Sequence, residues 1–367
     1  MNSEDLTATP SQVLKGYIAG VKDNDDPQPG EMEVNSLLSF SCAAYSGSRV
    51  LAKWQNPKAA KGKPYSGVVI RYSTSGSPGK IGGSQVYKGA GNNTESEGQS
   101  QAYVDLPAIS TAYYLSCIPY VTTSQGELLG DALDAAVTTG GMQTAVIRGT
   151  QTYTIPAGYS KVDLFAVGGG GGGSYGTSYS GGGGGGGGYT KTVKAVSVEP
   201  GDILTISIGG GGYFYNAGGA TSIVRNGTVL LSTLGGKGSG NGSGTSEGGS
   251  GGSGGGEGGV ANSGFNGGSN GSNAQYGGRG QGSTTRAFGE PSGTLYAGGG
   301  GGGAYSGGQI GYGGAGGGGN GGTYAGYNSA SNGGANTGGG AGGKGRNTNN
   351  PGSGMTGGSG IALIRLY

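Results

Sequence analysis

Residues Ser174–Val196 read SYGTSYSGGGGGGGGYTKTVKAV, with eight consecutive glycines, Gly181 to Gly188, at the centre. Glycine loses more conformational entropy on ordering than any other residue, so such a run is a flexible linker unless something specific to glycine holds it. The run lies between KVDLFAV (161–167) and TKTVKAVSV (190–198), which both have the composition of β-strands. The position of this run therefore favours an architectural role for its glycines.

The composition divides the chain into two different parts. Only 32% of the 367 residues are hydrophobic and 11% are charged, whereas 98 are glycine. The first 160 residues hold 19 glycines, which leaves 98 − 19 = 79 for the remaining 207 residues. We expect an attachment peptide over 1–34, a β-sandwich over 35–140 and a glycine-rich domain over 141–367, giving an all-β protein.

The N-terminal segment has no signal-peptide pattern, because MNSEDLTATP lacks a basic start and an apolar core. No apolar run is long enough to span a membrane. Residues 10–26 form one amphipathic stretch before the turn-rich PQPGEM. An attachment peptide and an unstructured leader both fit this segment.

Period-two alternation begins at Leu37, with turn residues about every ten positions. In GVVIRYS we expect Val68, Ile70 and Tyr72 to face a core, and Val69, Arg71 and Ser73 to face water. Seven short strands in about 100 residues indicate a β-sandwich. The predicted strands lie within 37–47, 49–57, 66–76, 84–92, 100–108, 111–123 and 131–139.

This region resembles a fibronectin type III module. Trp54 lies in the second strand, where that fold buries an aromatic residue, and Thr111 and Tyr113 match part of its L-x-P-G-T-x-Y-x-V signature. Leu106 lies one residue too far back, and Ile109 and Ser110 replace the expected Pro-Gly. The resemblance implies a spacer module. We expect Cys42 and Cys117 to be buried thiols.

The glycine-rich half opens and closes with apolar segments. After a predicted hinge around 140–149 come strand-like runs, a hairpin turn at Asn226-Gly227, and a last strand over 360–367. Between them, glycine runs alternate with short aromatic or Asn-rich tips, which indicates extended struts joined by loops. Polyproline II helices suit such struts, since eight residues at roughly 3.1 Å each span about 25 Å. Without Cβ atoms, neighbouring polyglycine II helices pack closely enough to exchange hydrogen bonds.

The successive motifs TIPAGYSKVDLFAVGGGGGG, VEPGDILTISIGGGG, GGATSI and GGSGIALIRLY resemble the glycine-rich domain of phage tail proteins. The chain is more distantly similar to the tip adhesins of T-even-like tail fibres. That resemblance implies bundled polyglycine II helices that present variable loops to a host receptor.

Enzymatic and metal-dependent chemistry has little support in the sequence. The chain contains no His, so the commonest general base and transition-metal ligand are missing. The six Asp and Glu residues beyond position 160 are scattered, and the many G-x-G-x-x-G matches reflect composition alone. We therefore expect no enzyme, no cofactor and no catalytic or metal site. The net charge of +2 gives no basic arm for nucleic acid.

Aromatic residues in the tips are the best candidates for binding, because a Tyr ring offers rigid contact area and a hydroxyl group. About half of them are expected to pack the bundle instead. Four basic residues have two interpretations, contact with anionic glycans or a solvated charge. They are Arg279, Arg286, Lys344 and Arg346. The receptor-binding candidates are Tyr175, Tyr179, Tyr213, Phe214, Tyr215, Tyr296, Tyr305, Tyr312, Tyr324 and Tyr327.

Together these features predict a phage tail-fibre or tail-tip receptor-binding protein. Its partners would be a bacterial surface receptor, either a glycan or an outer surface protein, and other tail proteins bound through the N-terminal region. It would be made in the host cytoplasm, belong to the virion tail and act outside the cell, without inserting into a membrane. The alternative is a purely structural spacer or cap of the tail.

Overall fold

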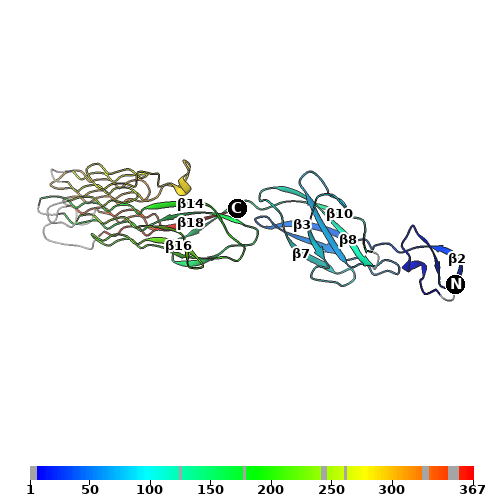
Figure 1. Cartoon of the computed structure of the whole chain (residues 1–367). Helices are drawn as coiled ribbons and strands as arrows, with labels where there is room; N and C mark the ends of the chain where they lie inside the picture. Colours follow the sequence, from blue (N-terminus) through cyan, green and yellow to red (C-terminus); the bar gives the residue numbers. More distant parts are fainter. Residues whose placement is uncertain are drawn as a thin grey trace. The chain divides into compact units, whose positions relative to one another are not determined.

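The computed structural model describes residues 6–123, 126–176, 179–240, 246–259, 263–324, 330–345 and 355–367. Its regular elements are β-strands and two short 3₁₀ turns, so the described chain is all-β, as predicted. It divides into two compact units (Figure 1). The first comprises residues 1–142, 156–159 and 367; the second comprises 143–155 and 160–366.

The first unit begins with a small ordered segment. A 3₁₀ turn, η2 (Pro10–Gln12), precedes an antiparallel hairpin of β1 (Ile18–Val21) and β2 (Asn24–Pro29). Backbone bonds then join it to the sandwich, as Glu33 N donates to Gly62 O over 3.1 Å. The amphipathic stretch of residues 10–26 therefore forms a turn and part of a hairpin.

Two sheets form the β-sandwich, and all seven predicted strands are present. One sheet has the order β3-β4-β7, and the other β10-β8-β5-β6, with β9 paired to β8. The short strand β9 was not predicted. The bounds are β3 Ser39–Ser46, β4 Arg49–Gln55, β5 Gly67–Ser73, β6 Ser84–Gly89, β7 Gln99–Asp105, β8 Ala112–Thr123, β9 Gly126–Leu129 and β10 Leu133–Thr138.

The sandwich core contains Trp54, which is 1% exposed and donates from Nε1 to Asn56 Oδ1. Tyr113 is buried at the start of β8, and its hydroxyl accepts the backbone N–H of Ala108 over 3.0 Å. Ser110 takes the place of the expected glycine with a positive φ of 51°. The corner before β8 is therefore closed despite the altered signature.

One expectation about β5 is wrong: Val69 is buried rather than exposed to water. The loop between β5 and β6 is tied to the same strand pair, because Arg71 donates to Gly82 O and Gly79 N donates to Ser116 Oγ. The loop therefore covers the part of this face that carries Arg71 and Ser116.

The two cysteines are free thiols. Cys117 is buried, as predicted, and Cys42 is only half-buried. Desolvation still raises the pKa of the Cys42 thiol to about 11. Both side chains therefore behave as small apolar core residues at neutral pH.

Two four-stranded antiparallel sheets begin the second unit, with orders β11-β18-β13-β14 and β12-β15-β16-β17. The expected hinge is wrong in part, because residues 143–147 form β11 at the edge of the first sheet. The bounds are β11 Gln143–Ile147, β12 Gln151–Thr154, β13 Lys161–Val167, β14 Thr190–Ser197, β15 Ile203–Ser207, β16 Thr221–Arg225, β17 Thr228–Thr233 and β18 Ile361–Leu366.

Two local predictions in this unit are confirmed. Asn226 and Gly227 have φ of 49° and 78° and join β16 to β17 in a two-residue turn. The last strand, β18, pairs with β11 on one side and β13 on the other. The chain therefore ends in the middle of a sheet that it completes.

Extended glycine-rich segments without strand pairing, which we call struts, connect these strands along the chain (Figure 1). In the strut 181–188, Gly181, Gly184 and Gly187 donate to the carbonyls of Gly259, Gly256 and Ser253. Gly182, Gly185 and Gly188 donate to Lys344, Ala341 and Gly338. Each set advances by three residues and runs antiparallel to its partner. This repeat matches the roughly three residues per turn of a polyproline II helix.

The same strut is enclosed by other backbone. A Cβ added at Gly184 would lie 2.3 Å from Gly300 O, and one at Gly185 would lie 2.1 Å from Gly171 O. Neither distance is available to a real Cβ. Its hydrogen bonds and close approaches involve six neighbouring segments, namely 168–174, 235–240, 246–252, 253–259, 297–304 and 338–344.

A cap over β13 and β18 is formed by residues 284–297, which include the 3₁₀ turn η3 (Ala287–Gly289). Phe288 is buried with its ring centroid 5.9 Å from that of Phe165. Arg365 of β18 lies over the Phe288 ring, 4.0 Å from its centroid, and donates to both carboxylate oxygens of Glu290. These contacts fasten the cap to the final strand.

Replacing Gly184 with Ala should prevent native packing of the glycine-rich unit, since the methyl group would meet backbone and no cavity exists to take it. Gly210→Ala is the matched control, because no atom lies within 4 Å of a Cβ at that strut position. We expect lost or strongly lowered thermal stability for the first variant and an unchanged melting temperature for the second. Equal melting temperatures would contradict the close-packed bundle.

The Glu290 carboxylate should make stability depend on pH. Hydrogen bonding to Arg365 lowers its pKa below the usual 4.5, so the pair stabilises the fold above that pH and stops doing so as the carboxylate protonates in acid. Glu290→Gln should cost roughly 1 kcal/mol or less at neutral pH, because the pair is partly exposed. Denaturant unfolding of both proteins should show this difference shrinking as the pH falls below the ordinary carboxyl pKa of 4.5. A difference that grows in acid would contradict the assignment.

Candidate functional site

The struts place one set of turns away from the sheets. The strut 168–174 continues directly from β13, and the strut 181–188 leads into β14, so the turn between them lies at the far end. Gly182 N donates to Lys344 O there, Gly259 N donates to Gly303 O, and Ala304 N donates to Gly322 O. We call this end of the bundle the distal end. It carries Tyr175, Tyr179, Tyr305, Thr323, Tyr324 and Lys344.

Four of the predicted aromatic residues form one cluster, which we call the Tyr175 cluster: Tyr175, Tyr213, Phe214 and Tyr215. The ring centroid of Phe214 lies 4.5 Å from that of Tyr175 and 4.5 Å from that of Tyr213. Tyr215 lies 6.3 Å from Tyr175 and 5.9 Å from Phe214. Residues about 40 positions apart in the chain are thus brought together.

The second part of this cluster is a tight turn between β15 and β16. Asn216 donates from both its backbone N–H and its side-chain amide to Tyr213 O, over 3.3 and 2.9 Å. Phe214 has a positive φ of 50°, a conformation that a bulky residue adopts at a cost. The turn holds Tyr213 outward, with 51% of its surface exposed.

Burial shifts the pKa values of two groups in and beside the cluster. Lys344 Nζ lies 5.4 Å from the Tyr175 ring centroid, and desolvation lowers the pKa of Lys344. Desolvation also raises the pKa of Tyr175, with smaller contributions from Tyr213 and Tyr215. The cluster therefore combines an aromatic surface with a nearby cation. A cation is attracted to the face of an aromatic ring.

The remaining candidates lie in different places. Tyr179 and Tyr324 are exposed at the distal end, and Tyr305 is half-exposed there. Tyr312 is 57% exposed but lies on the side of the bundle, where its carbonyl accepts the N–H of Gly267. Tyr327 and Arg346 lie outside the described residues.

Tyr296 lies apart from the other binding candidates, in a packing position. It belongs to the cap, where its ring centroid lies 5.5 Å from that of Phe165 and packs against the buried cluster around β13. Burial raises the pKa of its hydroxyl. Arg286 likewise serves the cap by donating to Gly293 O over 2.8 Å. The sequence shows Tyr296 between glycine runs and gives no sign of this packing.

Residues 144–367, more than half of the chain, match the family described as glycine-rich domain. The chain belongs to this family. No sequence among the curated proteins matches it.

The glycine-rich domain also contains an aromatic pair that sequence reasoning missed. Phe265 and Tyr276 have ring centroids 5.0 Å apart, and Tyr276 is 68% exposed. Both stand between a glycine and a polar amide residue in a glycine-rich stretch, as the predicted tips do. That shared pattern was the available signal.

A ladder of polar side chains supports this side of the glycine-rich domain. Ser263 Oγ, Asn266 Oδ1 and Ser269 Oγ accept the backbone N–H groups of Gln309, Tyr312 and Ala315. Both series advance by three residues, so each side chain replaces a backbone carbonyl on one turn of the outer strut. Non-glycine residues at this spacing therefore serve the frame.

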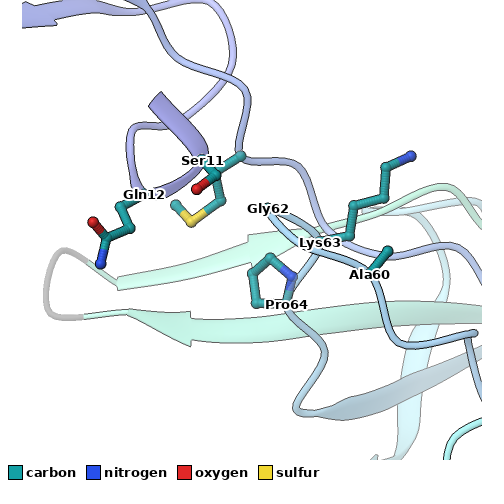
Figure 2. Close-up of a pocket in the computed structure, with 7 residues that line it drawn as sticks. Ser11, Gln12, Ala60, Gly62, Lys63 and Pro64 are labelled. Atoms are coloured by element: carbon teal, nitrogen blue, oxygen red, sulfur yellow. The ribbon is translucent and has the colours of Figure 1, made fainter. Parts of the chain in front are cut away.

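The first unit has a separate pocket of about 360 Å³. In Figure 2, Ser11 and Gln12 of the N-terminal segment face Gly62, Lys63 and Pro64 of the sandwich across it. Met32 and Ala60 complete the lining. No sequence motif predicted this pocket.

In the described ranges, no three His, Cys, Asp or Glu residues lie together as metal ligands would. Over the same ranges, no helix has the length and hydropathy needed to cross a membrane.

Changing both Tyr213 and Tyr215 to Phe should lower the pKa of Tyr175, because it removes two hydroxyl groups whose ionisation opposes that of Tyr175. The value should stay above the ordinary 10, since burial is the larger cause. A ¹³C NMR titration of the ring carbon bonded to oxygen measures both effects. An unchanged Tyr175 titration would contradict the proximity of the three hydroxyls.

Proposed function

We propose that this protein is a receptor-binding protein of a phage tail fibre or tail tip, and that its glycine-rich domain recognises the bacterial surface. The Tyr175 cluster is the observation that carries this proposal. It combines four neighbouring rings with a partly buried Lys344, and it includes Tyr175 and Lys344 of the distal end. Aromatic side chains on a rigid frame give contact area at a low ordering cost.

The receptor would be a surface glycan or an outer surface protein. Backbone hydrogen bonds fix the struts on either side of the turns, so little additional order is needed on binding. The protein would act by binding, as a component of the virion tail, without catalysis, cofactor, nucleic acid or membrane insertion.

The first unit would serve as an attachment and spacer segment. Its two-sheet arrangement, buried Trp54 and the Tyr113 hydroxyl bond to Ala108 N support a fibronectin type III-like module. The small hairpin before it would bind other tail proteins. A structural spacer or cap of the tail is the competing function, since close-packed struts would also suit a purely mechanical role.

Changing Tyr213, Phe214 and Tyr215 together to Ala should leave the bundle folded and weaken attachment to cells at least tenfold, because these rings form most of the cluster. Attachment of the labelled protein is measured on bacterial strains that retain the parent protein. Tyr114→Ala is the control, since this exposed tyrosine lies on the sandwich strand β8.

Normal attachment by a folded triple variant would exclude the Tyr175 cluster as the receptor site. Similar variants at Tyr179, Tyr305 and Tyr324 then test the other distal aromatics. If all of them attach as the parent does, the spacer function replaces the proposal.

A further inference from the structure

The aromatic pair Phe265–Tyr276 lies apart from the Tyr175 cluster. Phe265 N donates to Glu257 O in the strut 253–259. In the same strut, Gly256 O accepts the N–H of Gly184. In the strut 181–188, Gly186 O accepts the N–H of Gly171. Two struts therefore stand between the segment that leads to Tyr175 and the segment that carries Phe265, so the pair belongs to another side of the bundle.

Tyr276 has a backbone conformation that favours glycine. Its φ is 48°, which costs an L-residue on the order of 1 kcal/mol. Its ring is 68% exposed, so packing on Phe265 offsets only part of this cost. A chain with 98 glycines nevertheless has tyrosine here. Stability alone does not explain the residue, and strain kept at an exposed aromatic position indicates a binding role.

The surroundings of the pair are polar. Tyr312, 57% exposed, follows on the adjoining strut, where Asn266 Oδ1 accepts its N–H over 2.7 Å. The Asn266 amide group keeps its two donors on Nδ2. Charged groups of both signs lie on the neighbouring segments: Arg279 follows Tyr276 by three residues, and Glu257, whose carboxyl pKa is raised by desolvation and by Glu247, accepts the N–H of Phe265 through its backbone carbonyl. Exposed ring faces and an amide suit a ligand with apolar faces and hydroxyl groups, and charges of both signs nearby favour a ligand without net charge.

We propose that Phe265, Tyr276 and Tyr312, with Asn266 beside them, form a second binding site, and that its ligand is a neutral saccharide. A sugar ring would place its C–H face against a tyrosine ring while its hydroxyl groups bond the amide. This site is independent of the proposed receptor contact at the Tyr175 cluster. It would hold surface polysaccharide whether or not that cluster binds a receptor.

Affinity electrophoresis of the full chain through gels containing dextran, mannan or galactan tests the site. The parent should be retarded by at least one of these neutral polymers. Tyr276→Gly should weaken the retardation at least tenfold and should keep or raise the melting temperature, because glycine relieves the strain. Tyr312→Ala should also weaken it, whereas Tyr114→Ala and the triple variant of residues 213–215 should not.

The opposite results overturn the proposal. They are no retardation by any of the three polymers, retardation of Tyr276→Gly equal to that of the parent, or a lowered melting temperature for Tyr276→Gly, which would make the ring a structural element. Loss of retardation in the triple variant would assign saccharide binding to the Tyr175 cluster. If the triple variant loses cell attachment but is still retarded as the parent is, the second site is supported independently of the receptor contact.

Discussion

The hydrogen bond between backbone groups of neighbouring struts is the interaction on which the glycine-rich domain depends. Each turn of the strut 181–188 directs its N–H groups to different neighbours, and the pattern repeats every three residues. The neighbours come so close that a single Cβ would collide with a carbonyl oxygen. Glycine is therefore the residue that fits at these positions of the strut 181–188, and the hydrogen-bond network offsets the entropy lost on ordering it.

The sheets and the cap solve a different problem, which is how to begin and end the bundle. Struts continue from β13 and into β14, and the last segment of the chain inserts β18 between β11 and β13. An apolar core around Phe165 and Phe288 stabilises this end through burial. The two ends of the bundle thus differ: packing of apolar side chains dominates at one, and polar and aromatic turns at the other.

The sequence predicts the strands, turns and struts better than it predicts which of them are neighbours in the fold. Strands, the Asn226-Gly227 turn and the struts follow from local patterns, because alternation, turn residues and glycine runs are local properties. The Tyr175 cluster required knowledge of which struts are neighbours, which a glycine run does not encode. Tyr296 and Tyr276 show the same limit, because both stand among glycines. Tyr296 lies in the cap and packs on Phe165, whereas Tyr276 is exposed. Val69 was misplaced because alternation along one strand does not show which positions on the outer face are covered by other parts of the chain.

The turn after Ser174 has a consequence for how the distal end can change. Ser174 N donates to Gly183 O over 3.0 Å and its hydroxyl accepts Gly183 N over 2.8 Å, so the two ends of the turn are held together by the frame. The entropy of closing a loop then grows only slowly with its length, by about 0.6 kcal/mol for each doubling. Insertions at this point cost the fold little, so segments of new length and chemistry can be exchanged there while the struts keep their sequence.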